Sequence, residues 1–318
     1  MRDGARKLPP KSKDALAQAG ERADKRIGES ATDTLPGLLS APSAGTEPPL
    51  RTLALTPREG EMIKPAELID IDGATGLTLQ ARRLYNLLIA HAFGPELGRE
   101  GQEWTIELAS LRGSHKGNER IEESILALMK TIVTVRLADG RTRRVALLGG
   151  NDMDDPMRPR GTLTYSFDKR LAPLLRESSV FGKLELEVMR AFSTKYGLAL
   201  YEALSRRVRL AYVFSEVFEL DAFRELLGVP KGKLATYSNL NLKAIKPALA
   251  EINAMAAFGA TVEPVKRGRK VVAVRVCWWQ KSVDELREAY AELQRPRIGR
   301  SARLETRLGA QSQDTADG

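Results

Sequence analysis

Four cations stand within five consecutive residues at Lys266-Arg267-Gly268-Arg269-Lys270. Like charges at this density repel one another unless an anion lies among them, so the group favours contact with phosphates or with a DNA minor groove over an ordinary solvated turn. Residues 231–275 contain nine basic and two acidic residues, a net charge of +7, whereas the whole chain of 318 residues carries +9. The excess positive charge is therefore concentrated in one short segment.

A second group of polar side chains precedes this cationic turn. If the apolar residues spaced from Leu242 to Ile252 face the core of a helix over 239–254, the amides and ammonium groups near its start point outward. Asparagine can make two hydrogen bonds to adenine, and lysine reaches guanine acceptors or phosphates. The alternative is a solvated face with an N-cap, because most protein–DNA hydrogen bonds go to the backbone. The candidate base-reading residues are Asn239, Asn241, Lys243 and Lys246.

Pro247 interrupts the same helix. Proline has no N–H, so the carbonyl of Lys243 should lose its helical partner and the helix should bend or restart. The sequence leaves both a bent helix that follows a DNA groove and a simply shorter helix open.

The elements around these residues are predicted twice in the same order: an opening helix, a short helix, a turn, a longer helix and a β-hairpin. We expect Thr105 and Asp221 to be the N-caps of the two short helices, and Asp139-Gly140 to mark the first hairpin turn. The pattern predicts an α+β fold with two tandem winged-helix domains. The predicted ranges are 78–92, 105–112, 118–130 and 132–148 in the first copy, and 194–207, 221–227, 239–254 and 260–276 in the second.

The remaining segments divide the chain further. A strand over 163–167, a helix capped by Asp168 and a stretch over 184–192 are expected to connect the two copies, and Ser282 to Glu285 forms a capping-box start for a helix ending near Leu293. The Pro-, Gly- and Ser-rich start and the end from about Arg295 lack apolar periodicity and are predicted to be disordered arms. The predicted domains are 1–55 (arm), 56–180 (first winged helix), 181–280 (second winged helix) and 281–318 (helix and flexible tail).

Weaker candidates for contact with nucleic acid lie elsewhere. In the first copy Lys116, Asn118 and Arg120 lie just before and at the start of the long helix, but nearby glutamates offset their charge, so phosphate contact or a protein interface is favoured over base reading. Arg206 and Arg207 end the second opening helix, where cations are favourable without any ligand.

Enzymatic chemistry finds little support in the residue inventory. One cysteine and two histidines exclude a disulfide framework and a Cys- or His-rich metal site, and they fit a reducing cytosol. The glycine-rich stretch 228–233 lacks the spacing and hydroxyl of a phosphate-binding loop. No apolar run is long enough to cross a bilayer. We therefore expect an intracellular protein without catalytic residues, cofactor or metal; the acidic group Asp152, Asp154 and Asp155 leaves a metal-dependent nuclease as a remote alternative.

Four blocks of the second copy resemble the iteron-binding plasmid replication initiators of the Rep-3 type. The resemblance is strongest over 190–276, moderate over 75–175 and absent from both arms; the first arm is longer and richer in proline than the family pattern. Pro247 belongs to that pattern, which places it inside the recognition helix. The matching blocks are Tyr196–Leu204 (YGLALYEAL), Phe223–Val229 (FRELLGV), Leu242–Asn253 (LKAIKPALAEIN) and Val265–Val272 (VKRGRKVV).

The resemblance implies tandem winged-helix domains that bind directly repeated DNA at a plasmid origin and open the adjacent AT-rich duplex. It also implies recruitment of a host initiator ATPase and replicative helicase, a monomer–dimer equilibrium through the first domain, and repression of the protein's own operon. It assigns base reading to the four residues named above and backbone contact to Arg267, Arg269 and Lys270. The alternatives are a winged-helix transcriptional repressor and an interaction scaffold that binds DNA without preference.

Overall fold

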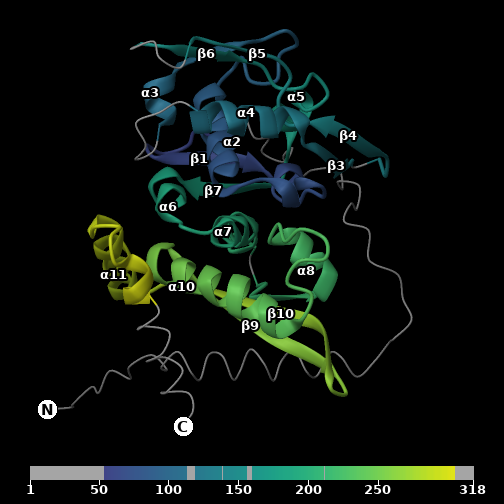
Figure 1. The fold of residues 1–318 in the computed structure, drawn as a ribbon, viewed down its shortest axis with the longest axis vertical. Coiled ribbons are helices and arrows are strands. Elements are labelled where there is room, and N and C mark those ends of the chain that lie inside the picture. Colours follow the sequence, from purple (N-terminus) through teal and green to yellow (C-terminus); the bar gives the residue numbers. More distant parts are fainter. Residues whose placement is uncertain (1–53, 113–118, 138, 156–159, 211, 305–318) are drawn as a thin grey trace, which may run out of the picture. The chain divides into compact units, whose positions relative to one another are not determined.

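The order helix, strand, helix, helix, hairpin occurs twice in the computed structural model, which describes residues 54–112, 119–137, 139–155, 160–210 and 212–304 (Figure 1). The described residues all belong to one compact unit. The repeat predicted from the sequence is therefore confirmed, with one added strand before each short helix. No helix within the described ranges is long and apolar enough to span a membrane.

The first winged helix opens with α2 (Leu79–Ala92), whose N-cap Thr78 accepts a hydrogen bond from the backbone N–H of Ala81 at 3.1 Å. Its β3–β4 hairpin turns at Gly140, where φ is +81°, as the Asp139-Gly140 signal predicts. The separate sheet β2-β6-β5 completes the domain. The other elements are β2 (Trp104–Glu107), α3 (Leu108–Leu111), α4 (Glu119–Lys130), β3 (Ile132–Arg136), β4 (Thr142–Ala146), β5 (Asn151–Met153) and β6 (Thr162–Tyr165).

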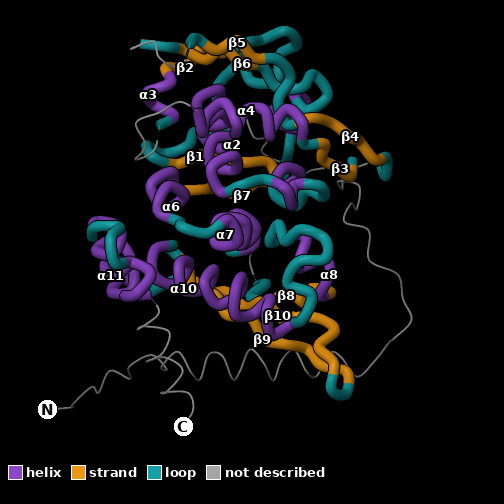
Figure 2. Tube along the Cα trace, in the orientation of Figure 1, coloured by secondary structure: helices purple, strands orange, loops and turns teal. Residues whose placement is uncertain are grey.

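The second winged helix opens with α7 (Lys195–Arg207), capped by Thr194. Here the added strand β8 (Ser215–Glu219) joins the wing, so that β10 lies between β8 and β9 in one three-stranded sheet (Figure 2). The other elements are α8 (Leu220–Leu226), α9 (Tyr237–Leu240), η4 (Asn241–Ile245), α10 (Lys246–Met255), β9 (Phe258–Arg267) and β10 (Lys270–Gln280).

Two predicted N-caps are wrong for a common reason. Thr105 lies inside β2, and Asp221 is the second residue of α8, whose N-cap is Glu219. In both domains a strand of four or five residues runs directly into the short helix. In so short a strand, the alternation of apolar and polar residues cannot be distinguished in the sequence from the start of a helix.

Strands β1 (Glu61–Pro65) and β7 (Phe181–Glu185) pair antiparallel and bring the two ends of the first domain together. A buried polar network then joins this pair to both opening helices. The Nζ of Lys64 on β1 donates to Asn86 on α2 and to Glu202 on α7, each at 2.9 Å. Since all three residues are at most 4% exposed, the charges of Lys64 and Glu202 depend on each other. The helices α5 (Ala172–Glu177) and α6 (Leu186–Ala191) precede and follow β7; the N-cap of α5 is Leu171, so the cap predicted at Asp168 is wrong.

Helix α11 (Val283–Gln294) has the capping box predicted at Ser282 and Glu285, with both reciprocal hydrogen bonds formed. It packs against α10 and α6. The arm predicted to start near Arg295 is wrong for residues 295–304, because arginines there hold the chain to α11. Glu292, fully buried, forms ion pairs with Arg295 at 3.1 Å and with Arg303 at 2.9 Å. Arg300, also buried, donates to the carbonyls of residues 191 and 292. The predicted first arm, and the tail beyond residue 304, lie outside the described residues apart from residues 54 and 55.

Candidate nucleic-acid interface

The predicted recognition helix begins earlier than expected and contains a π-turn. Thr236, rather than Asn239, is its N-cap and accepts from the backbone N–H of Asn239 at 3.3 Å. The helix continues from α9 through η4 into α10, so it runs from Tyr237 to Met255. Across η4 the N–H of Lys246 donates to the carbonyl of Asn241, five residues back. This wider turn lies directly before Pro247, where the helix needs no N–H.

The π-turn changes which side chains face the core. The buried positions are Leu240, Ala244, Ile245, Ala248 and Ile252, all fully covered. Leu242, predicted to be a core residue, is instead 62% exposed. The prediction is wrong because it assumed a constant 3.6-residue period through a stretch whose hydrogen bonds span five residues.

The outward side of this helix carries the residues predicted to read bases. Asn239, Lys243 and Lys246 are exposed, and Asn241 is half-buried. With Leu242, the three exposed polar residues form an outward stripe, Asn239-Leu242-Lys243-Lys246, spaced by three, one and three residues. These spacings place the side chains on one face within the first ten residues of the helix. A recognition helix presents this half to base edges.

The turn between α8 and the recognition helix is fixed by Arg224. Its guanidinium donates to the carbonyls of Leu234 at 3.1 Å and Ala235 at 2.8 Å, and it also pairs with Asp221 at 3.1 Å. This role could not be predicted from the sequence, because an arginine at a short-helix position normally indicates a solvated face.

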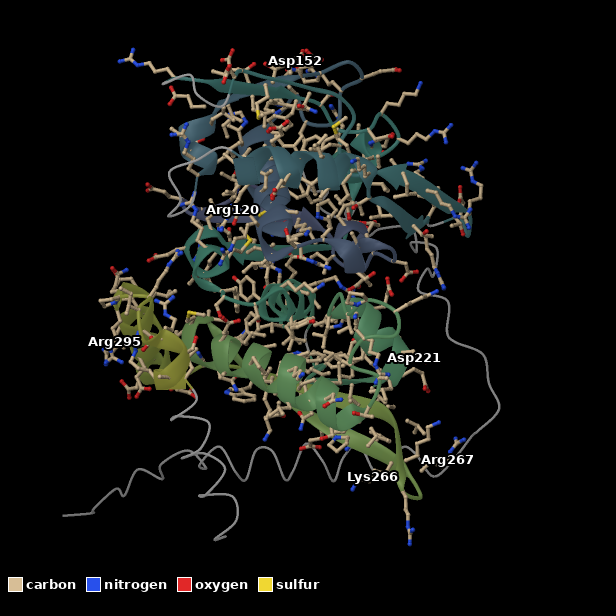
Figure 3. The ribbon with its side chains drawn as sticks, in the orientation of Figure 1. Arg120, Asp152, Asp221, Lys266, Arg267 and Arg295 are labelled. Atoms are coloured by element: carbon tan, nitrogen blue, oxygen red, sulfur yellow. The ribbon has the colours of Figure 1, made fainter. Side chains whose placement is uncertain are left out.

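The wing tip, residues 266–270, closes the β9–β10 hairpin with a two-residue loop. Gly268 has φ +62° at the first loop position, as a type II′ hairpin turn requires. All four cations of the wing tip are exposed, and none forms an ion pair with another described residue. In Figure 3 the side chains of Lys266 and Arg267 project from the end of the hairpin. An unneutralised cluster of this kind is suited to bind a polyanion.

The recognition helix is anchored from behind by Glu251 of α10. This buried carboxylate accepts from the Ser193 N–H and from the Thr194 hydroxyl at 2.8 Å, next to the first turn of α7. Burial raises the pKa of Glu251, although these hydrogen bonds oppose the shift. Gly197 leaves room for this contact, since a Cβ there would collide with the Glu251 carboxylate. Its position within the basic segment 231–275 suggested that Glu251 offsets the positive charge of the surface. The structure instead buries this carboxylate behind the recognition helix.

Arg206 and Arg207 are better explained by ion pairs than by DNA. Arg206 pairs with Asp70 at 2.6 Å. Arg207, with a side chain only 5% exposed, pairs with Asp70 at 3.1 Å and with Glu216 at 2.6 Å. For Arg207 the predicted DNA contact is wrong, because the buried guanidinium has no path to a phosphate. The two arginines instead bind the end of α7 to the first domain and to β8.

In the described part of the first domain, two arginines of the hairpin have partners within the fold. Arg120 lies exposed on α4 (Figure 3), whereas Lys116 and Asn118 lie outside the described residues. On its hairpin, Arg141 pairs with Asp139 at 2.6 Å, and Arg143 donates to the carbonyl of Arg170 at 2.6 Å. These two hairpin arginines are therefore less available to an external anion than the cations of the wing tip.

The acidic residues considered for a metal site do not form a ligand set. Asp152 is exposed on β5 (Figure 3), and Asp154 accepts from the Thr162 backbone N–H at 2.8 Å and from its hydroxyl at 3.1 Å. Among the described residues, no three His, Cys, Asp or Glu side chains are grouped so that they could hold a metal ion.

Comparison with known proteins agrees with this architecture. The model of the family "Initiator Replication protein, WH1" matches residues 61–205, and that of "Initiator Rep protein, WH2" matches residues 219–276. No curated protein sequence matches the chain. Among solved structures, the Pi initiator protein in complex with iteron DNA is similar, with a TM-score of 0.51 and 16% identity; the match covers 72% of this chain and 100% of that one. The two family models together cover more than half of the chain, which belongs to the Rep family of replication initiators and has the tandem winged-helix fold of that family.

Proposed function

We propose that this protein initiates plasmid replication by binding directly repeated double-stranded DNA at the origin. The observation that carries the proposal is a pair of exposed features of the second domain: a recognition helix whose outward stripe holds an amide and two ammonium groups, and a wing tip whose four cations form no ion pair with another described residue. Membership of the Rep family and the similar Pi protein, solved with iteron DNA, support the same ligand.

The two parts of this surface have different tasks. The outward stripe enters a major groove and supplies base contacts through Asn239, Lys243 and Lys246, whereas the fourth predicted base-reading residue, Asn241, is half-buried. The wing tip, through Arg267, Arg269 and Lys270, binds phosphates or an adjacent minor groove. The first surface therefore sets which sequence is bound, and the second adds affinity that depends on salt.

Opening of the adjacent AT-rich duplex would draw on binding energy and DNA bending rather than on nucleotide hydrolysis. We therefore propose a non-enzymatic initiator that needs neither cofactor nor metal and acts in the bacterial cytoplasm. It would recruit a host initiator ATPase and replicative helicase. It would also dimerise through the first domain, where Arg120 and the paired hairpin arginines suit phosphate or protein contacts, and as a dimer repress its own operon.

Footprinting on the DNA that flanks the gene tests this proposal. Protection of tandem direct repeats of about two helical turns, beside an AT-rich tract that becomes reactive to permanganate, is the expected result. Protection of a lone inverted repeat without duplex opening would instead identify a transcriptional repressor. Nicking of supercoiled plasmid in Mg²⁺, lost in Asp154→Ala, would show a nuclease.

A further inference from the structure

Leu242 is a large apolar side chain at the centre of a surface that is otherwise polar. It is 62% exposed and lies in the outward stripe between Asn239 and Lys243. Single exposed apolar side chains are common on proteins and need no explanation by themselves. Leu242 differs from these cases because it lies among the residues predicted to contact bases.

The core of the domain does not use Leu242. The residues that follow it, Ala244 and Ile245, are fully buried, and so is Leu240 before it. Across the π-turn of η4, these three residues on either side of Leu242 pack into the core, and Leu242 itself points outward. Its exposed face is surrounded by positive charge from Lys243 and Lys246, so an apolar protein surface would bury these ammonium groups at high cost. A DNA groove has phosphates for the ammonium groups, which makes it the occupant that fits both kinds of side chain.

Only one base offers an apolar group in the major groove. Thymine presents its 5-methyl group there, whereas guanine, cytosine and adenine present hydrogen-bonding atoms that leucine cannot satisfy. Placing Leu242 over another base would leave such an atom desolvated and unpaired. We propose that Leu242 is a specificity-determining residue that contacts the 5-methyl group of one thymine in each bound repeat. This inference rests on the proposed function and adds the base that the leucine selects.

The test uses deoxyuridine, which keeps every hydrogen-bonding atom of thymine and lacks only the methyl group. The full chain first selects its preferred duplex from a random library, and each thymine of that duplex is then replaced in turn. At one position the wild type should lose affinity about fourfold, the value for burial of one methyl group at about 0.8 kcal/mol. Leu242→Ala should bind the thymine duplex more weakly and lose nothing further at that position.

Leu126→Ala is the matched control, because Leu126 is also exposed, at 44%, but lies on α4 of the first domain. It should keep the full fourfold response to deoxyuridine. Since both leucines are exposed, neither variant should alter the thermal unfolding midpoint, and this is checked in parallel. The proposal is overturned if no thymine methyl affects the wild type, or if Leu242→Ala responds to every replacement as the wild type does. A chain that selects no sequence overturns the proposed function and this inference with it.

Discussion

Removal of two arginines from the wing tip should change how DNA binding depends on salt. Arg267 and Arg269 are exposed and unpaired among the described residues, so Arg267→Gln/Arg269→Gln should leave the fold intact. Each phosphate neutralised contributes about 0.9 to the slope of log K against log salt concentration. If each arginine binds one phosphate, the slope should become shallower by about 1.8. At 0.1 M salt the variant should therefore bind about 60-fold more weakly than the wild type, and this difference should decrease as the salt concentration approaches 1 M.

Fluorescence anisotropy with a labelled origin duplex, from 0.05 to 0.5 M salt, measures this slope. The control, Arg99→Gln/Arg287→Gln, changes the net charge equally but removes arginines that pair with Glu96 at 2.7 Å and Asp284 at 2.9 Å. Its slope should stay close to that of the wild type. An unchanged slope in the wing-tip variant, or an equal change in the control, would refute a phosphate-binding wing and leave only a diffuse charge effect.

Four further predictions follow from the structure. Asn241→Ala, at the half-buried position of the predicted base-reading set, should reduce discrimination between the origin repeat and random DNA more than it reduces binding to random DNA; equal losses in competition assays would remove Asn241 from the base-reading set. Thr236→Ala should lower the free energy of unfolding in urea by about 1 kcal/mol, because it removes the N-cap of the recognition helix, whereas exposed Ser238→Ala should change little. Gly197→Ala should destabilise by about 1–3 kcal/mol by crowding Glu251 and Phe192, whereas Gly76→Ala, with open space around it, should have no such effect; equal unfolding midpoints would contradict the packing. Burial alone would raise the pKa of Glu292, but hydrogen bonds from Arg303 and Arg295 outweigh it and lower the pKa below 4.5, so its stabilisation should be present above about pH 4.5 and be lost as the pH falls through the lowered value. Glu292→Gln should lack this part of the acid sensitivity in thermal melts from pH 7 to pH 3, and an unchanged profile would assign that sensitivity to other groups.

Local rules were enough to find much of the candidate interface. The Ser282 capping box was predicted correctly because its two hydrogen bonds join residues only three positions apart, and the ranges of the two opening helices were close to those observed. The cationic hairpin was recognised because a glycine turn between two β-rich runs is also a local signal. The doubled order of elements then pointed to two winged helices without any tertiary information.

Contacts between distant segments decided the rest. The pairing of β1 with β7, the network of Lys64 with Glu202, and the ion pairs of Arg206 and Arg207 join residues more than a hundred positions apart, apart from the pair with Glu216. A cation that looks free in the sequence is therefore neutralised in the fold. Burial likewise cannot be inferred from the sequence for Glu251, whose carboxylate would be counted with the surface charge of 231–275 and is buried in the structure.

Leu242 marks the boundary between the two kinds of information. The sequence determined by itself that an amphipathic helix with amides and lysines at its start would precede a cationic hairpin, because residue type and spacing fix a helix face when the period is constant. Only the tertiary structure decided which apolar side chain that helix would leave outside. A single π-turn before Pro247 shifts the phase of the helix, and packing of Ala244 and Ile245 into the core keeps that phase.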